Sequence, residues 1–175
     1  GDLRVLKLSN TSISKIEKLE YHPNLKRIYL NNNHIKKIEG LESLENSEGV
    51  FLQNNQIHEI EGLDGLEMVE ILDLSENMIE RIEGIPNVSY LKLGRNKIES
   101  MAGLEELDIL HDLDLSFNQI RRIKDPGLPF LCTLTLEGNP LPDEILARLD
   151  KRGQIKGPQK IRDFLAFCED FQANG

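Results

Sequence analysis

Histidine, cysteine and carboxylate side chains are the residues of this chain that could carry out catalysis or bind a metal. The four histidines, His22, His34, His58 and His111, are spread over the sequence, and none lies within a His-Glu-x-x-His motif. The sequence also has no Cys-x-x-Cys pair and no glycine-rich phosphate-binding loop that ends in lysine. We therefore expect no catalytic residue, no metal site and no cofactor.

A cation site built from aspartates is the strongest alternative. Asp112 and Asp114 lie two residues apart, so they would point the same way from one strand, and Asp73 could supply a third oxygen ligand. A hard cation such as Ca²⁺ needs about six to eight oxygen ligands, and the sequence offers no evident source of the others. The pattern therefore favours a hydrated acidic surface patch over a metal site.

The overall charge argues against one class of partner. Of 175 residues, 30 are acidic and 21 are lysine or arginine, which gives a formal net charge of −9. Binding to DNA or RNA depends on lysine and arginine displacing counterions, so we expect no nucleic-acid partner. No apolar run approaches about 18 residues, so no membrane insertion is expected. Cys132 and Cys168 are too few for a disulfide framework, which predicts free thiols and a cytoplasmic location.

The dominant feature of the sequence is an internal repeat of about 22 residues. One column of the repeat holds an asparagine with spacings of 22, 22, 19, 22 and 21 residues, and Thr11 occupies that column one period earlier. Alternating aliphatic residues precede each column position, and an isoleucine or leucine follows two residues after it. Seven registers of one pattern predict a solenoid of stacked repeats. The column asparagines are Asn33, Asn55, Asn77, Asn96, Asn118 and Asn139.

The spacing within each repeat predicts its local structure. Alternating apolar residues favour a short strand with one buried face, and stacked strands would form a parallel sheet. About ten residues remain for the return path, which is too short for a long α-helix and two turns, so we expect extended or 3₁₀ segments there. The column asparagines are expected to bond backbone groups where the chain leaves each strand, and their stacked amides to satisfy one another.

This pattern resembles the leucine-rich repeat family, and within it the 22-residue class typified by the regulatory subunit of protein phosphatase 1. The phrase Ile38-Glu39-Gly40-Leu41 recurs as Ile60-Glu61-Gly62-Leu63 and Ile82-Glu83-Gly84-Ile85, a habit of that class. The resemblance covers residues 3–141. It implies an α/β leucine-rich repeat solenoid that is curved, with the parallel sheet on its concave face and short 3₁₀ or extended segments on its convex face.

The two ends of the array differ. Repeat arrays need polar caps, and no cap precedes Leu3, whereas the tail contains two expected helices, one over residues 143–152 and one after Gly157-Pro158. This tail resembles the one that ends leucine-rich arrays in Roco-type GTPases and similar multidomain signalling proteins. The expected organisation is seven leucine-rich repeats over residues 1–141 and a C-terminal helical cap over residues 142–175.

Two repeats depart from the pattern. Ser47 replaces the first leucine of its repeat, which suggests a weak layer of the core there that we expect the fold to tolerate. The repeat that contains residues 82–88 is three residues short, which should alter the local curvature on the convex side.

Variable positions on the strands point away from the leucines and should line the concave face. Aromatic side chains that the core does not need are typical of the centres of interfaces. Bands of opposite charge suit a folded protein partner better than nucleic acid or an anionic membrane. The predicted partner-binding residues are Tyr29, Phe51, Ile71, Asp73, Tyr90, Lys92, Arg95, Asp112 and Asp114.

The sequence therefore predicts a non-catalytic module that binds a protein partner, or a neighbouring domain of the same chain, on its concave face. Two alternatives remain open. The chain could be the recognition portion of a larger multidomain enzyme such as a Roco-type GTPase, with no catalytic residue of its own. It could instead be a stand-alone phosphatase regulator or cytoskeletal scaffold, although the missing N-terminal cap and the atypical tail disfavour that reading.

Overall fold

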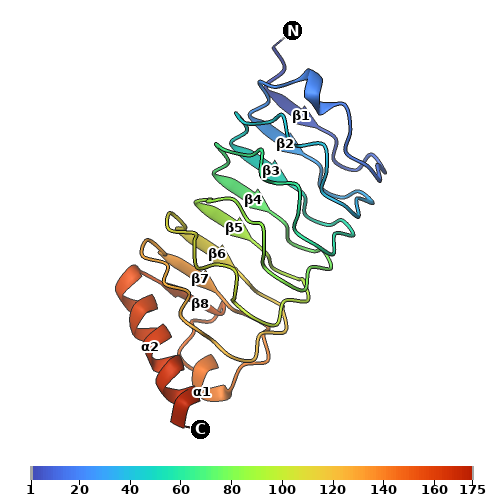
Figure 1. Cartoon of the computed structure of the whole chain (residues 1–175). Helices are drawn as coiled ribbons and strands as arrows, with labels where there is room; N and C mark the ends of the chain where they lie inside the picture. Colours follow the sequence, from blue (N-terminus) through green and yellow to red (C-terminus); the bar gives the residue numbers. More distant parts are fainter. Residues whose placement is uncertain (1, 175) are drawn as a thin grey trace.

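Seven short strands stack into one parallel sheet in this computed structural model, which describes residues 2–174 (Figure 1). The order of the strands in the sheet follows the sequence, so each repeat packs against its neighbours along the chain. The protein is thus the expected parallel-sheet solenoid. The strands are β1 Val5–Lys7, β2 Arg27–Tyr29, β3 Gly49–Phe51, β4 Ile71–Asp73, β5 Tyr90–Lys92, β6 Asp112–Asp114 and β7 Thr133–Thr135.

Aliphatic side chains fill the interior of the solenoid in one layer per repeat. The middle residue of each strand from β2 to β7 has no exposed surface, and each is the register partner of the next. Burying one such side chain is worth about 1.5–3 kcal/mol, so the stability of the array comes from repetition of one layer. These residues are Ile28, Val50, Leu72, Leu91, Leu113 and Leu134.

Extended and turn segments return the chain along the convex side, as the short return path predicts. The 3₁₀ turn η1, Leu19–Tyr21, is the single helical element within residues 2–142. Glycine is required on this path because the repeats approach one another through their backbones. Gly103 has a φ of +100°, and a Cβ at this position would overlap the carbonyl oxygen of Ile82 in the preceding repeat.

Each column asparagine joins two successive repeats through the backbone. The amide nitrogen of Asn77 donates to the carbonyl oxygen of Leu74 in its own repeat at 3.1 Å and to that of Leu52 in the preceding repeat at 3.0 Å. Its Oδ1 accepts the backbone N–H of Ile57 at 3.0 Å, and the other column asparagines repeat this arrangement. The amides therefore bond peptide groups and not one another, which corrects the expectation from the sequence. A carboxamide offers both donors and an acceptor, so one side chain can satisfy peptide groups of both repeats.

Ser47 interrupts the leucine pattern without leaving an unpaired polar group. The residue has no exposed surface, and its Oγ donates to the carbonyl oxygen of Leu25 at 2.6 Å. A buried hydroxyl costs stability mainly when it lacks a partner. The layer is therefore not weakened in the way that the sequence suggested.

A strand and a helix close the C-terminal end of the solenoid (Figure 1). β8, Gln154–Lys156, pairs with β7 in antiparallel orientation, and α2, Pro158–Asn174, contacts both strands. The side chains of Ile161, Phe164 and Leu165 on α2 are buried, so the helix covers the last aliphatic layer as the amphipathic pattern predicts.

The helix that precedes β8 is shorter than the sequence predicts. α1 spans Asp143–Leu146 and not residues 143–152, because the chain tightens after Leu146, where the N–H of Arg148 donates to the carbonyl oxygen of Ile145, and then turns at Asp150. The Oδ1 of Asp150 accepts the backbone N–H groups of Arg152 at 2.8 Å and Gln154 at 2.9 Å, and Gly153 adopts a φ of +65°. Such local side-chain bonds compete with the helical pattern, and they start an antiparallel strand that the sequence analysis missed.

We predict that Asn77→Ala lowers the free energy of unfolding by about 1–3 kcal/mol, because it leaves buried peptide groups without partners. Asn24→Ala is the matched control, since Asn24 is exposed and lies outside the column. Urea denaturation followed by circular dichroism measures both variants. Equal unfolding midpoints for the two proteins would contradict a structural role for the column.

Deletion of residues 142–175 should remove the cover of the last layer and expose Leu134, Leu136 and Leu141. We expect a loss of several kcal/mol in unfolding free energy and concentration-dependent aggregation, because the exposed patch is apolar and contiguous. Sedimentation velocity and thermal melting test this. Deletion of residues 173–175 alone should have no effect, and a stable monomer after the longer deletion would rule out a capping role.

Candidate protein-binding face

Two columns of strand side chains line the face of the sheet opposite the aliphatic core. The pairing of each strand with the next places the members of a column side by side. The first column is Val5, Arg27, Gly49, Ile71, Tyr90, Asp112 and Thr133. The second column is Lys7, Tyr29, Phe51, Asp73, Lys92, Asp114 and Thr135.

β8 extends both columns by one residue that the sequence analysis missed. Lys156 lies beside Thr133 in the first column, and Gln154 lies beside Thr135 in the second. The Nε2 of Gln154 donates to the Oγ1 of Thr135 at 3.1 Å, which ties β8 to β7. The alternation Gln-Ile-Lys after a turn aspartate and a glycine was the available signal for this strand.

Tyr29 and Phe51 form a stacked aromatic pair in the N-terminal half of the second column. Their ring centroids are 4.6 Å apart and the rings are within 3° of parallel. Both residues are half-buried, so part of the pair remains open to solvent. Gly49 lies next to the pair, and a Cβ there would come within 3.1 Å of the Phe51 ring. Because glycine has no side chain, the Phe51 ring can lie flat over this position.

Ile71 and Tyr90 continue this apolar surface along the first column. Ile71 pairs with Gly49 on one side and Tyr90 on the other. Ile71 is half-buried, and 48% of Tyr90 is exposed. We call the four side chains Tyr29, Phe51, Ile71 and Tyr90 the aromatic strip.

Asp73 is less accessible than the sequence suggested. The residue is 8% exposed, and its Oδ1 accepts both the backbone N–H of Ser75 at 3.0 Å and the Ser75 hydroxyl at 2.7 Å. Its carboxylate thus stabilises the end of β4. The sequence pattern does not predict this burial, because Asp114 at the equivalent position of β6 is more exposed.

The aspartates of β6 lie on the C-terminal half of the face. Burial disfavours the charged form of Asp112 and raises the pKa of its carboxyl group, while a hydrogen bond from Thr133 opposes that shift. Asp114 accepts the backbone N–H of Ser116 at 2.9 Å. Within residues 2–174, no group of three histidine, cysteine or acidic side chains is placed to hold a metal ion.

The two predicted basic residues have different settings. Lys92 is exposed in the second column between Asp73 and Asp114. Arg95 lies in the turn after β5, where its guanidinium packs over the Phe117 ring at 4.2 Å from the centroid. The cation–π contact holds the Arg95 side chain against Phe117, in the turn and not on a strand.

The remaining reactive side chains do not converge on a site. Burial raises the pKa of the Cys168 thiol to about 12, so this cysteine is a packing residue of α2. Cys132 is half-buried and donates to the carbonyl oxygen of Phe130 at 3.3 Å. No helix within residues 2–174 has the length and the apolar composition needed to cross a bilayer.

Comparisons with known proteins agree with this architecture. Residues 2–43 match a family model described as leucine-rich repeats in two copies. The search of curated protein sequences gives no significant match.

Several solved structures share the fold. An internalin from Listeria monocytogenes is 22% identical with a TM-score of 0.57, covering 79% of this chain and 48% of its own. Internalin C2 from the same species is 26% identical with a TM-score of 0.56, covering 79% of this chain and 73% of its own. A leucine-rich repeat protein from Leptospira interrogans is 23% identical with a TM-score of 0.63, covering 95% of this chain and 48% of its own.

The chain spans about half the length of the first and third of these proteins, at 48% of each. Similarity at this level of identity shows the fold alone. The family match covers two repeats at one end, and the same asparagine bonds recur along the whole sheet. Together they show the fold of a leucine-rich repeat solenoid, which is typical of protein–protein interaction modules.

Proposed function

We propose that the protein is a non-catalytic recognition module that binds a protein partner, or a neighbouring domain of its own chain, on the concave face. The observation that carries this proposal is the aromatic strip. Its side chains lie on the side of the sheet that the aliphatic core does not use, and the fold requires none of them.

The chemistry of the strip suits a protein partner. Tyrosine and phenylalanine supply large contact areas at low cost in side-chain entropy, and such residues dominate the energetics of protein interfaces. The stack of Tyr29 on Phe51 holds both rings before any partner arrives, so little ordering is needed on binding.

The charges around the strip would orient the partner. Lys7 and Arg27 lie at the N-terminal end of the columns, Asp112 and Asp114 follow Lys92, and Lys156 extends the first column past them. A partner with a complementary order of charges would bind in one direction only. The proposed contact residues are Tyr29, Phe51, Ile71, Tyr90, Lys92, Arg95, Asp112 and Asp114, with Asp73 shaping the sheet between them.

The finer classification is part of this proposal. The 22-residue spacing and the recurring Ile-Glu-Gly phrase support the class typified by the regulatory subunit of protein phosphatase 1. A tail that runs from Asn139-Pro140-Leu141-Pro142 into α1 and α2 supports the resemblance to arrays of Roco-type and similar multidomain proteins. The two free thiols support a reducing compartment such as the cytoplasm.

We predict that Phe51→Ala and Tyr90→Ala each weaken binding of the native partner at least about tenfold, or 1.4 kcal/mol. Tyr90→Ala should leave the melting temperature unchanged, because the side chain is largely exposed. Phe51→Ala also removes the stack on Tyr29, which costs about 0.5–1.5 kcal/mol of folding stability.

Lys36→Ala and Glu80→Ala are the controls, since both residues are exposed on the return path outside the sheet. The partner is first captured from a native extract and then titrated against all four purified variants by calorimetry. Wild-type affinity in both concave variants, together with loss of binding in the controls, would place the site elsewhere.

A further inference from the structure

Three loops that lead into the strands carry carboxylates and no lysine or arginine. Residues 41–48, 63–70 and 104–111 precede β3, β4 and β6, and each segment has three acidic side chains. All are exposed except Glu48, which is half-buried and lies 2.9 Å from Lys26. We call this surface the acidic edge. Its members are Glu42, Glu45, Glu48, Asp64, Glu67, Glu70, Glu105, Glu106 and Asp108.

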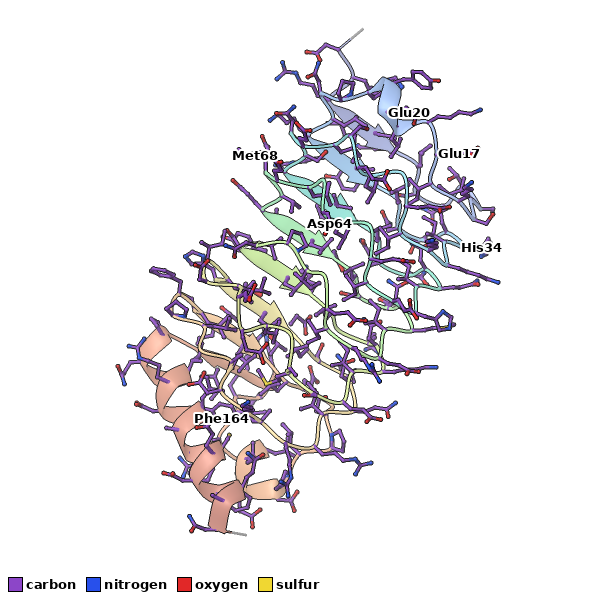
Figure 2. The ribbon with its side chains drawn as sticks, viewed as in Figure 1. Glu17, Glu20, His34, Asp64, Met68 and Phe164 are labelled. Carbon is purple, nitrogen blue, oxygen red and sulfur yellow. The ribbon has the colours of Figure 1, made fainter. Side chains whose placement is uncertain are left out.

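Exposed apolar side chains occur in two of these three loops and in the loop that precedes β7. Three exposed residues each lie three positions before a strand: Met68 before β4, Ile109 before β6 and Phe130 before β7. They therefore occupy equivalent positions in the repeats that contain these strands. Their exposed fractions are 60%, 41% and 57%. Neighbouring strands are about 4.8 Å apart, which places Ile109 next to Phe130 and leaves one repeat between Ile109 and Met68. Figure 2 shows Met68 on the side of the solenoid opposite His34. We call these three residues the edge row.

The repeat between Met68 and Ile109 contributes an amide to the row. Asn87 occupies the equivalent position before β5, and its Nδ2 donates to the Oδ1 of Asp108 at 2.7 Å. His111 stacks on Phe130 with ring centroids 6.3 Å apart, which widens the apolar surface toward the concave face. An amide therefore interrupts the apolar row between β4 and β6, and carboxylates lie directly beside Met68 and Ile109 in the sequence.

The fold does not require apolar residues at these positions. The equivalent residues before β2 and β3 are Asn24 and Asn46, which are both exposed. The edge row contributes nothing to the buried core, and it gathers three of the large exposed apolar side chains on one line. Exposed apolar patches with polar rims mark interaction sites.

We propose that the edge row and the acidic edge form a second docking surface, whose occupant is a basic amphipathic segment of a protein partner. Apolar side chains of the segment pack on Met68, Ile109 and Phe130, and its lysines and arginines pair with flanking carboxylates such as Glu67 and Glu70. Charge complementarity selects this occupant, because the nine carboxylates repel nucleic acid and anionic membranes. A second copy of the chain is disfavoured as the occupant, because a symmetric dimer would bring two identical acidic edges together and like charges repel.

The test uses an 18-residue helical peptide of leucine and lysine as the probe, titrated into the isotope-labelled full chain. We expect amide shifts confined to residues 64–70, 104–111 and 128–132. The triple variant Met68→Ser, Ile109→Ser, Phe130→Ser should bind at least tenfold more weakly. The matched control Tyr21→Ser, Leu146→Ser removes exposed apolar side chains elsewhere and should bind like the wild type.

Charge variants separate this surface from general attraction to an acidic protein. The pair Glu67→Gln, Glu70→Gln should weaken binding and reduce its salt dependence more than Glu80→Gln, Glu99→Gln, which alters the convex side. A peptide with glutamate in place of lysine should not bind.

Wild-type affinity in the triple variant, or shifts that map to the aromatic strip, would overturn the proposal. Sedimentation that shows a wild-type dimer dissociated by the triple variant would assign the surface to a second copy of the chain instead. Because the substituted side chains are exposed, melting curves should show that all variants remain folded.

Discussion

The bonds of each column asparagine to the backbone of two successive repeats are the constraint on which the structure depends. They fix how one turn of the chain stacks on the next, because one carboxamide satisfies a carbonyl group in each of the two repeats and an N–H group of the preceding repeat. The aliphatic layers then stack in register, and the glycines of the return path permit the close approach of neighbouring backbones. Without these bonds, the turns would bury unpaired peptide groups at every repeat.

Two surfaces of the solenoid consist of residues that do not stabilise the fold. Asparagine and leucine hold the fold at fixed positions, so residues on the concave face and at the edge of the strands can vary without loss of the core. Such positions are informative when they are apolar, since solvent alone would not favour an exposed Tyr90 or Phe130. The fold is therefore typical of binding proteins, while the chemistry of individual side chains indicates which surfaces bind.

The repeated parts of the structure could be predicted from the sequence because each local signal occurs many times. The repeat of about 22 residues predicts the strand positions and the asparagine column. It also predicts that Tyr29 and Phe51 lie on the same face of the sheet. Features that occur once could not be predicted in this way. The turn at Asp150 and the strand β8 depend on two side-chain bonds and one glycine, and the burial of Asp73 is not shared by Asp114, although each accepts a bond from a serine two residues later.

The two candidate surfaces differ in the kind of partner that each can select. The aromatic strip lies among basic and acidic side chains in a fixed order, so it can fix both the position and the direction of one partner. The acidic edge has a single sign of charge, so it gives attraction and a faster encounter but no direction along its length. Direction there can come only from the uneven spacing of the edge row, where Asn87 separates Met68 from the adjoining Ile109 and Phe130. That unevenness coincides with the repeat that is three residues short, because Asn87 lies within that repeat.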